Sequence, residues 1–254
     1  MLLRDPEVVG SNPTPAIFLL FCSLHCKMFI EQITLLTGHI DEKYNYKIIY
    51  SNFVKINKYS AELAGILLGD GSINIYPKIN HYRLQITLNS NEKEYAEYIR
   101  KLFKVIFDKE LSIKFRKDEN TLDLFCFNRK IIRELINLGF VTSPKWNRAK
   151  IPTQFMNLRI GKYVLLGYFD TDGCVVITNN NGTKYPRLEM KIMPSPMKRQ
   201  FQELLDKYNF KYGIYEIGRG EVRVQMNGNK LLKKWKEEIG FSNNKNNILI
   251  KFNL

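Results

Sequence analysis

The 254-residue chain is poor in the residue types that build extracellular scaffolds and zinc centres: it has four cysteines and three histidines. Four cysteines are too few for a disulfide framework in a chain of this length. Cys22 and Cys26 lack the second pair of ligands that a zinc site needs. Cys126 and Cys174 fall in strand-like segments, where small apolar residues are expected. This usage predicts an intracellular, reducing compartment, either cytoplasm and nucleoid or an organelle matrix.

A long apolar run is also missing. The apolar stretch at residues 16–24 is far too short to cross a bilayer, so no membrane partner is expected. The proline-containing stretch before it suits neither a signal peptide nor a folded element. Its codons can spell the core of a transfer-RNA T-arm, so we expect residues 1–27 to be a non-native or disordered extension and translation to start at Met28. Residues 28–57 form a segment of unclear structure.

Acidic residues are scarce relative to basic ones. The chain carries 39 Lys and Arg against 25 Asp and Glu, a formal net charge of +14. All of the excess lies beyond residue 54, where 35 basic residues face 20 acidic ones. Such an excess points to a polyanion, most often nucleic acid. Composition alone does not separate this reading from an ordinary basic surface.

Two glycine-bounded acidic segments recur along the chain. Residues 63–71 read LAGILLGDG and residues 165–173 read LLGYFDTDG, which places Asp70 and Asp172 at the same point of each copy, 102 residues apart. Each copy is an apolar helical run that ends in Asp-Gly and leads into strand-like residues. One Asp-Gly could simply end a helix. Two at this spacing predict a pseudo-two-fold protein with both carboxylates on its axis.

The small residues inside these segments predict a helix interface. A glycine within a helix costs about 1 kcal/mol relative to alanine, so Gly65 and Gly69 need a reason. At this spacing they lie on one face, where missing side chains let a second helix approach closely. Gly167 and Thr171 offer the matching face. Packing along these faces would bring the two motif carboxylates side by side.

The repeat extends beyond the motifs. Residues 83–88 match residues 187–192, and both alternate polar and apolar residues, as strands with one covered face do. Further helical and strand-like runs follow in the same order in both halves, at 92–107, 112–117 and 122–127, and at 196–208, 212–217 and 222–226. The predicted fold class is α+β, a tandem pseudo-two-fold repeat of α-β-β-α-β-β-α with two saddle-forming antiparallel sheets and the motif helices at the interface. The repeats are assigned to residues 58–142 and 155–254, with a linker at 143–154.

The two motifs and this element order resemble the LAGLIDADG homing endonuclease family in its two-motif, single-chain form, over about residues 58–254. The resemblance implies a monomeric, site-specific endonuclease that cuts both strands of a DNA target with Mg²⁺ or Mn²⁺, encoded by a mobile intron or a free-standing gene. Family members also act as RNA maturases that assist splicing, so intron RNA is the alternative partner. A DNA-binding regulator on the same scaffold is disfavoured, because a pure binder gains nothing from burying two repelling carboxylates.

The chemistry of phosphodiester hydrolysis selects the catalytic candidates. Paired carboxylates that hold Mg²⁺ activate a water and neutralise charge on the leaving oxygen. Asp70 and Asp172 fit that role, and the backbone carbonyls of Gly69 and Thr171 could add ligands. The family places a basic residue that polarises water near the start of the helix that closes each half. Lys130 and Lys230 lie there, although each could equally be a surface lysine.

Two positions break the symmetry of the halves. Asn89 matches a position that is often Gln in the family, but its counterpart is Met193, which leaves that role open in the second half. Asp170 has Leu68 as its counterpart. We therefore expect Asp170 to be structural, because the closing acid is the one present in both copies.

The polar positions of the alternating strands are the DNA-binding candidates. Arg and Gln suit guanine and adenine edges in the major groove, and Lys contributes mainly to phosphates. Glu189 is the odd member, which reads a cytosine amine or balances a neighbour. Any one of these side chains could equally be a solvated sheet residue. The set is Arg83, Gln85, Thr87, Lys114, Arg116, Arg187, Glu189, Lys191, Arg223 and Gln225.

Overall fold

The computed structural model describes residues 54–247, so the interpretations of residues 1–27 and 28–53 lie outside the described part. Two series of elements follow one another in the same order, which confirms the predicted α+β repeat. The first series is α2 (Lys58–Gly69), β1 (Gly71–Tyr76), β2 (His81–Asn89), α3 (Lys93–Phe107), β3 (Ser112–Arg116), β4 (Thr121–Cys126) and α4 (Arg129–Asn137). The second is α5 (Gly161–Asp172), β5 (Gly173–Asn180), β6 (Thr183–Ile192), α6 (Met197–Lys207), β7 (Gly213–Gly218), β8 (Glu221–Asn227) and α7 (Asn229–Glu238). Short 3₁₀ turns are η1 (Pro77–Ile79), η2 (Lys117–Glu119) and η3 (Thr153–Phe155).

Each series builds one four-stranded antiparallel sheet. The strand order is β1-β2-β4-β3 in the first and β5-β6-β8-β7 in the second, so the topology is the same. The alternation of the strands decides which face is covered: Leu84, Ile86 and Leu88 of β2 are buried, whereas the polar residues between them stay partly exposed. No helix within residues 54–247 is long and apolar enough to span a membrane.

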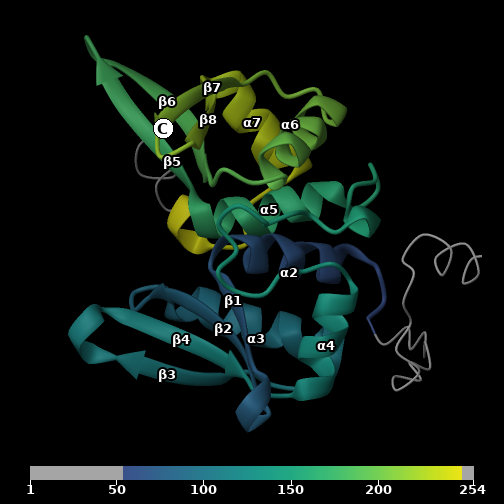
Figure 1. The fold of residues 1–254 in the computed structure, drawn as a ribbon. Helices are drawn as coiled ribbons and strands as arrows, with labels where there is room; N and C mark the ends of the chain where they lie inside the picture. The colour runs from purple at the N-terminus through teal and green to yellow at the C-terminus, as the bar shows by residue number, and fades with distance from the viewer. Residues whose placement is uncertain (1–53, 248–254) are drawn as a thin grey trace, which may run out of the picture. The chain divides into compact units, whose positions relative to one another are not determined.

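Helices α2 and α5 run through the middle of this arrangement, between the two sheets (Figure 1). Both are apolar around most of their circumference, which is the pattern of a helix that is buried on all sides. Helix α2 begins with a capping box, in which the Asn57 side chain accepts hydrogen bonds from the backbone N of Tyr59 and Ser60 while Ser60 Oγ accepts one from Asn57 N. The start of this motif helix is therefore fixed locally.

The small residues of the motifs lie where α2 and α5 touch. A methyl group on Gly65 would overlap the Val164 carbonyl and lie 2.6 Å from the Tyr168 N. A methyl group on Gly167 would overlap the Glu62 carbonyl in the same way. The two helices are therefore in backbone contact, which no larger residue at these two positions would allow.

Candidate active site

Asp70 and Asp172 come together at the adjoining C-terminal ends of the two central helices. Asp70 caps α2, and its backbone N donates to the Ile66 carbonyl over 3.1 Å. Asp172 is the last residue of α5. A methyl group on Gly69 would lie 2.9 Å from Thr171 Cβ and 3.0 Å from Asp172 Oδ2. The Asp172 carboxylate thus lies against the backbone one residue before Asp70.

Ionising both acids costs free energy in this setting. Burial and the charge of Asp172 raise the pKa of Asp70 to about 7, and Glu92 adds to the effect. Burial also raises the pKa of Asp172, against the opposing charges of Lys145, Lys191 and Lys245. Moreover, a carboxylate at a helix C-terminus meets the negative end of the helix dipole. A cation between the two carboxylates would offset this cost.

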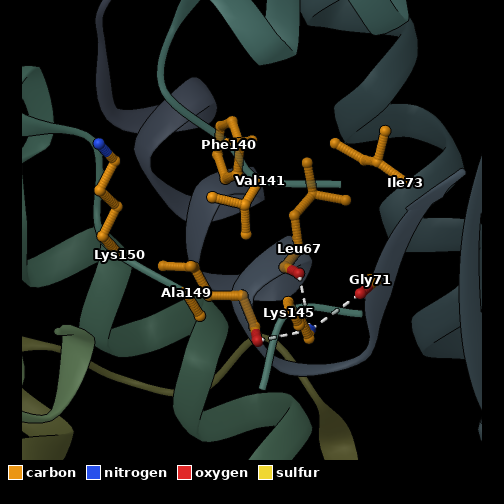
Figure 2. A pocket seen from close by; sticks show the side chains of 9 residues that line it. Leu67, Gly71, Ile73, Phe140, Val141, Lys145, Ala149 and Lys150 are labelled. Atoms are coloured by element: carbon orange, nitrogen blue, oxygen red, sulfur yellow. Dashed lines mark hydrogen bonds between the residues drawn. The ribbon is translucent and has the colours of Figure 1, made fainter. Parts of the chain in front are cut away.

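Lys145, from the segment between the repeats, places a positive charge at this point. Its Nζ donates to carbonyl oxygens at the end of α2, namely Leu67 at 3.2 Å, Leu68 at 2.6 Å, Gly69 at 2.5 Å and Gly71 at 2.8 Å. Figure 2 shows the ammonium group pointing to the carbonyls of Leu67 and Gly71, with Phe140, Val141 and Ala149 alongside. Helix α2 has no basic residue in its own last turn. A lysine distant in sequence therefore satisfies carbonyls that a helix end leaves unpaired.

The apolar surroundings of Lys145 affect its own titration. Burial lowers the pKa of Lys145 to about 8, while the charges of Asp172 and Asp70 act in the opposite direction. Three charged groups thus share one small, poorly solvated volume. Since the ammonium group is held by backbone carbonyls, its position does not depend on the two carboxylates.

Lys245 occupies the corresponding place after α7, the last helix of the second series. It follows Gly240-Phe241 as Lys145 follows Gly139-Phe140, with one residue fewer between. Its Nζ lies 2.9 Å from Oε1 of Glu92, the residue that precedes α3, and its charge lowers the pKa of both motif acids. Sequence reasoning missed both lysines. Extending the alignment of the halves past the Gly-Phe pairs would have found them.

The other predicted members of the site are placed as follows. Lys130 and Lys230 are exposed in the first turns of α4 and α7, and their roles stay predictions. The Gly69 carbonyl is one of the four that Lys145 contacts. Thr171 Oγ1 donates back to the Gly167 and Tyr168 carbonyls of its own helix. Asn89 is exposed, and its side chain accepts a hydrogen bond from the Asn91 N in a turn.

The DNA-binding candidates of each half share one face of their sheet. Thr87 and Lys114 both lie opposite Asp123, and Glu189 lies opposite Gln225. Directly opposed residues point to the same side of a sheet. This is the face away from the buried side chains. The first sheet presents Arg83, Gln85, Thr87, Lys114 and Arg116 there, and the second presents Arg187, Glu189, Lys191, Arg223 and Gln225.

A carboxylate organises the polar face of the first sheet. Asp123 of β4 is buried and accepts hydrogen bonds from Thr87 Oγ1 at 2.6 Å and Gln85 Nε2 at 2.9 Å, while Arg116 Nε lies 2.7 Å from its other oxygen. Burial alone would raise the pKa of Asp123, but the hydrogen bonds from these three side chains lower it below its usual value. Sequence reasoning missed Asp123, although the alternation of β4 puts it on the polar face.

Glu189 has the same function in the second sheet. Its carboxylate lies 3.1 Å from Arg187 Nε and 3.6 Å from Arg223 Nε, and it accepts a hydrogen bond from Gln225 Nε2 at 3.1 Å. These contacts favour the reading in which Glu189 balances neighbouring side chains, and a role in reading a base stays a prediction. The two carboxylates thus contact the side chains of Gln85, Arg116, Arg187, Arg223 and Gln225.

The donor set of the two motif acids suits a hard divalent cation. Mg²⁺ is commonly held by one or two carboxylates together with water and substrate phosphates. Between residues 54 and 247, no group of three or more His, Cys, Asp and Glu side chains is arranged to hold a metal ion. A cation between Asp70 and Asp172 would thus keep open positions for the oxygens of a substrate.

Comparison with known proteins agrees with this architecture. A model of the LAGLIDADG-like domain matches residues 162–240. A DNA polymerase of Methanocaldococcus jannaschii is 27% identical over 176 residues, which are 61% of this chain and 9% of the polymerase. Because the match spans so little of that protein, it carries no argument for polymerase activity here.

Several solved structures share the fold. The homing endonuclease I-WcaI, bound to its DNA recognition sequence, is 20% identical with a TM-score of 0.53, over 72% of this chain and 81% of that one. I-DmoI in complex with DNA and Mn is 17% identical with a TM-score of 0.53, over 73% and 98%. The meganuclease I-AabMI, bound to uncleaved DNA, is 14% identical with a TM-score of 0.53, over 77% and 89%. The chain has the fold of these LAGLIDADG homing endonucleases, with two sheets in a single chain, as the family resemblance predicts for its architecture.

Proposed function

We propose that this protein is a site-specific endonuclease that cuts both strands of a DNA target with Mg²⁺, or Mn²⁺ in its place, bound between Asp70 and Asp172. One observation carries the proposal: two helices in backbone contact bring a carboxylate from each repeat to one point, beside a lysine fixed on carbonyls. A protein that merely bound DNA would not need this arrangement, since bringing two acids together without a cation is unfavourable. The DNA-bound relatives support the same substrate.

The motif acids and the two nearby lysines would have different roles in hydrolysis. A divalent cation held by the two carboxylates would activate a water molecule and neutralise charge on the leaving oxygen. Asp70 and Asp172 would hold this cation from opposite repeats, so that one carboxylate would serve each half of the target. The Lys145 ammonium group donates its hydrogen bonds to backbone carbonyls at the end of α2 and stays charged. Its fixed positive charge favours the ionised form of both acids. Lys245 adds a second positive charge from the other repeat.

The polar faces of the two sheets would select the target. The arginines and lysines there neutralise phosphates, and the arginines and glutamines suit base edges in the major groove. Asp123 and Glu189 fix the orientation of these side chains, so that less conformational entropy is lost on binding. The excess of basic residues beyond residue 54 provides the long-range attraction. A single chain with two sheets would read an asymmetric target as a monomer.

A randomised duplex library tests the proposal whatever the base sequence of the target. Incubation of the protein with the library in Mg²⁺, followed by sequencing of the ends produced, should give one family of sites cut on both strands. EDTA should abolish cleavage, and Asp70→Asn or Asp172→Asn should do so with DNA affinity kept within about threefold. The matched control is Asp118→Asn, which neutralises an exposed carboxylate on η2 and should leave cleavage unchanged.

Two results would contradict the proposal that the protein is an endonuclease. Wild-type protein that binds duplex DNA and cuts none of it in Mg²⁺ would refute an endonuclease. If the same protein speeds splicing of the intron that carries its gene, and the two Asn variants splice as well as wild type, the maturase alternative replaces it. A fold that binds RNA as a splicing factor requires no metal-bound nucleophile at Asp70 and Asp172.

A further inference from the structure

The segment that follows α7, residues 242–246, docks on elements of the first repeat. Ser242 Oγ donates to Glu62 Oε1 of α2 over 2.7 Å. Asn243 Nδ2 donates to Glu92 Oε1, beside the start of α3, also over 2.7 Å. Lys245 reaches the same Glu92 oxygen at 2.9 Å. The position of the Lys245 charge thus depends on how this segment is held.

Asp170 holds the segment from the side of α5. The Asp170 side chain is fully buried, and its Oδ2 accepts hydrogen bonds from the backbone N of Ser242 at 2.6 Å and of Asn243 at 3.0 Å. Its Oδ1 accepts one from Asn246 Nδ2 at 3.2 Å, and its carbonyl accepts one from Asn243 Nδ2 at 3.2 Å. Both carboxylate oxygens are therefore engaged with one short stretch of chain, on either side of Lys245.

The first repeat does not need such an anchor. There the counterpart of Asp170 is Leu68, and the counterpart of Lys245 is Lys145, which binds the carbonyls of α2 directly. Lys245 pairs with the side chain of Glu92, which can move. The position of Lys245 therefore depends on how the backbone of its own segment is held. This difference accounts for an acid in the second motif that the first motif lacks.

We propose that Asp170 is a positioning residue, which docks residues 242–246 so that Lys245 stays beside Glu92 and the two motif acids. The inference rests on the proposed function, because it assigns the charge of Lys245 to DNA cleavage. Catalytic groups have to be held within a fraction of an ångström by surrounding hydrogen bonds, and lysine alone is flexible. Two backbone amides bound to one buried carboxylate supply that restraint.

A double-mutant cycle separates positioning from a general structural role. On a duplex selected by the wild-type protein, Asp170→Asn should slow single-turnover cleavage in Mg²⁺ about 10- to 100-fold, with the Kd for DNA changed less than about threefold. In a Lys245→Gln background the same substitution should slow cleavage less than about threefold further, because the lysine that it positions is already gone. If the slowing of cleavage in the double variant equals the product of the slowing in the two single variants, the proposal is overturned.

Hydrogen exchange tests the docking independently of cleavage. In Asp170→Asn the amides of Ser242 and Asn243 should exchange faster than in wild type, and unchanged exchange would overturn the role of Asp170. Glu237→Gln is the matched control, since it neutralises an exposed carboxylate on α7, outside residues 242–246; its cleavage rate should equal that of wild type. If Asp170→Asn does not fold, Asn243→Ala enters the cycle in its place, because it removes two other hydrogen bonds that dock the segment, from Asn243 Nδ2 to Glu92 Oε1 and to the Asp170 carbonyl. Wild-type protein that cuts no duplex would refute the proposed function, and the exchange result would then decide the docking alone.

Discussion

Replacing Asp70 with asparagine tests whether the motif acids repel each other in the folded protein. Burial and the charge of Asp172 raise the pKa of Asp70 to about 7, whereas the ordinary value is 3.8. Between these two values the folded state binds the proton that the unfolded state has released. Without metal, wild-type stability should therefore fall as the pH rises from about 4 to about 7, and stay level above that. Asparagine, which has nearly the same shape and no charge, removes this loss.

The size of the effect follows from the pKa difference. Each pKa unit corresponds to about 1.4 kcal/mol, so ionised Asp70 destabilises the fold by at most about 4 kcal/mol above pH 7. Between pH 5 and pH 8 the stability of the variant relative to wild type should rise by roughly 3 kcal/mol. Asp170, whose pKa burial also raises to about 7, titrates in both proteins and cancels in the difference. For a folded unit of this size, the gap in Tm should widen by roughly 6–12 °C.

Thermal or urea unfolding in EDTA at pH 5, 6, 7 and 8 provides the measurement. Mg²⁺ should stabilise the wild-type protein and narrow its gap to the variant, because a ligand that binds only the folded state adds stability. Asp118→Asn, which removes an exposed carboxylate on η2, serves as the control for the loss of one negative charge. A gap of the same size at every pH would refute the reasoning, because it would mean that Asp70 titrates normally in the folded state.

Four further predictions concern the surroundings of the acids. Lys145→Met should slow cleavage at least about 100-fold and move the rising limb of the pH–rate profile to higher pH, since losing a cation raises the pKa of both acids. If Lys130 and Lys230 polarise water, Lys→Met at either should slow cleavage with little change in DNA affinity, and unaltered rates would make them surface residues. Asp123→Asn should relax base preference in one half of the target, as judged by sequencing selected sites, while the other half stays unchanged. DNA affinity should fall steeply with salt, and a titration that shows no salt dependence would argue against a nucleic-acid partner.

The features that could be predicted from the sequence are those that depend on a local pattern of residues. The alternation at residues 83–88 puts Leu84 and Ile86 in the core and their polar neighbours outside, whatever the strand pairs with. Gly65 and Gly167 mark the helix contact because no other residue fits a backbone approach this close. Boundaries were less accurate: the strand expected at 222–226 runs from Glu221 to Asn227, because pairing with β7 and β6 extends its two ends.

The features that were missed depend on partners far apart in sequence. Lys145 contacts carbonyls 74 to 78 residues before it, and nothing in its immediate neighbours indicates this. Asp123 became recognisable once the register placed it beside Thr87 and Arg116. The prediction for Lys130 rests on a position in the family, whereas the lysines whose charges act on Asp70 are Lys145 and Lys245, which follow α4 and α7. Local pattern indicates which face a side chain occupies; tertiary structure decides what it meets there.

The chemistry of this site works against the stability of the fold that carries it. A helix C-terminus favours a cation in its last turn, yet α2 and α5 end in acids. Part of the cost is offset by Lys145, which itself is buried and has a lowered pKa. Substitutions that neutralise Asp70 or Asp172 should therefore stabilise the metal-free protein while they remove the metal site. Selection for stability alone would erode both acids, so the presence of an acid at the same place in both repeats is best explained by a reaction that requires the pair.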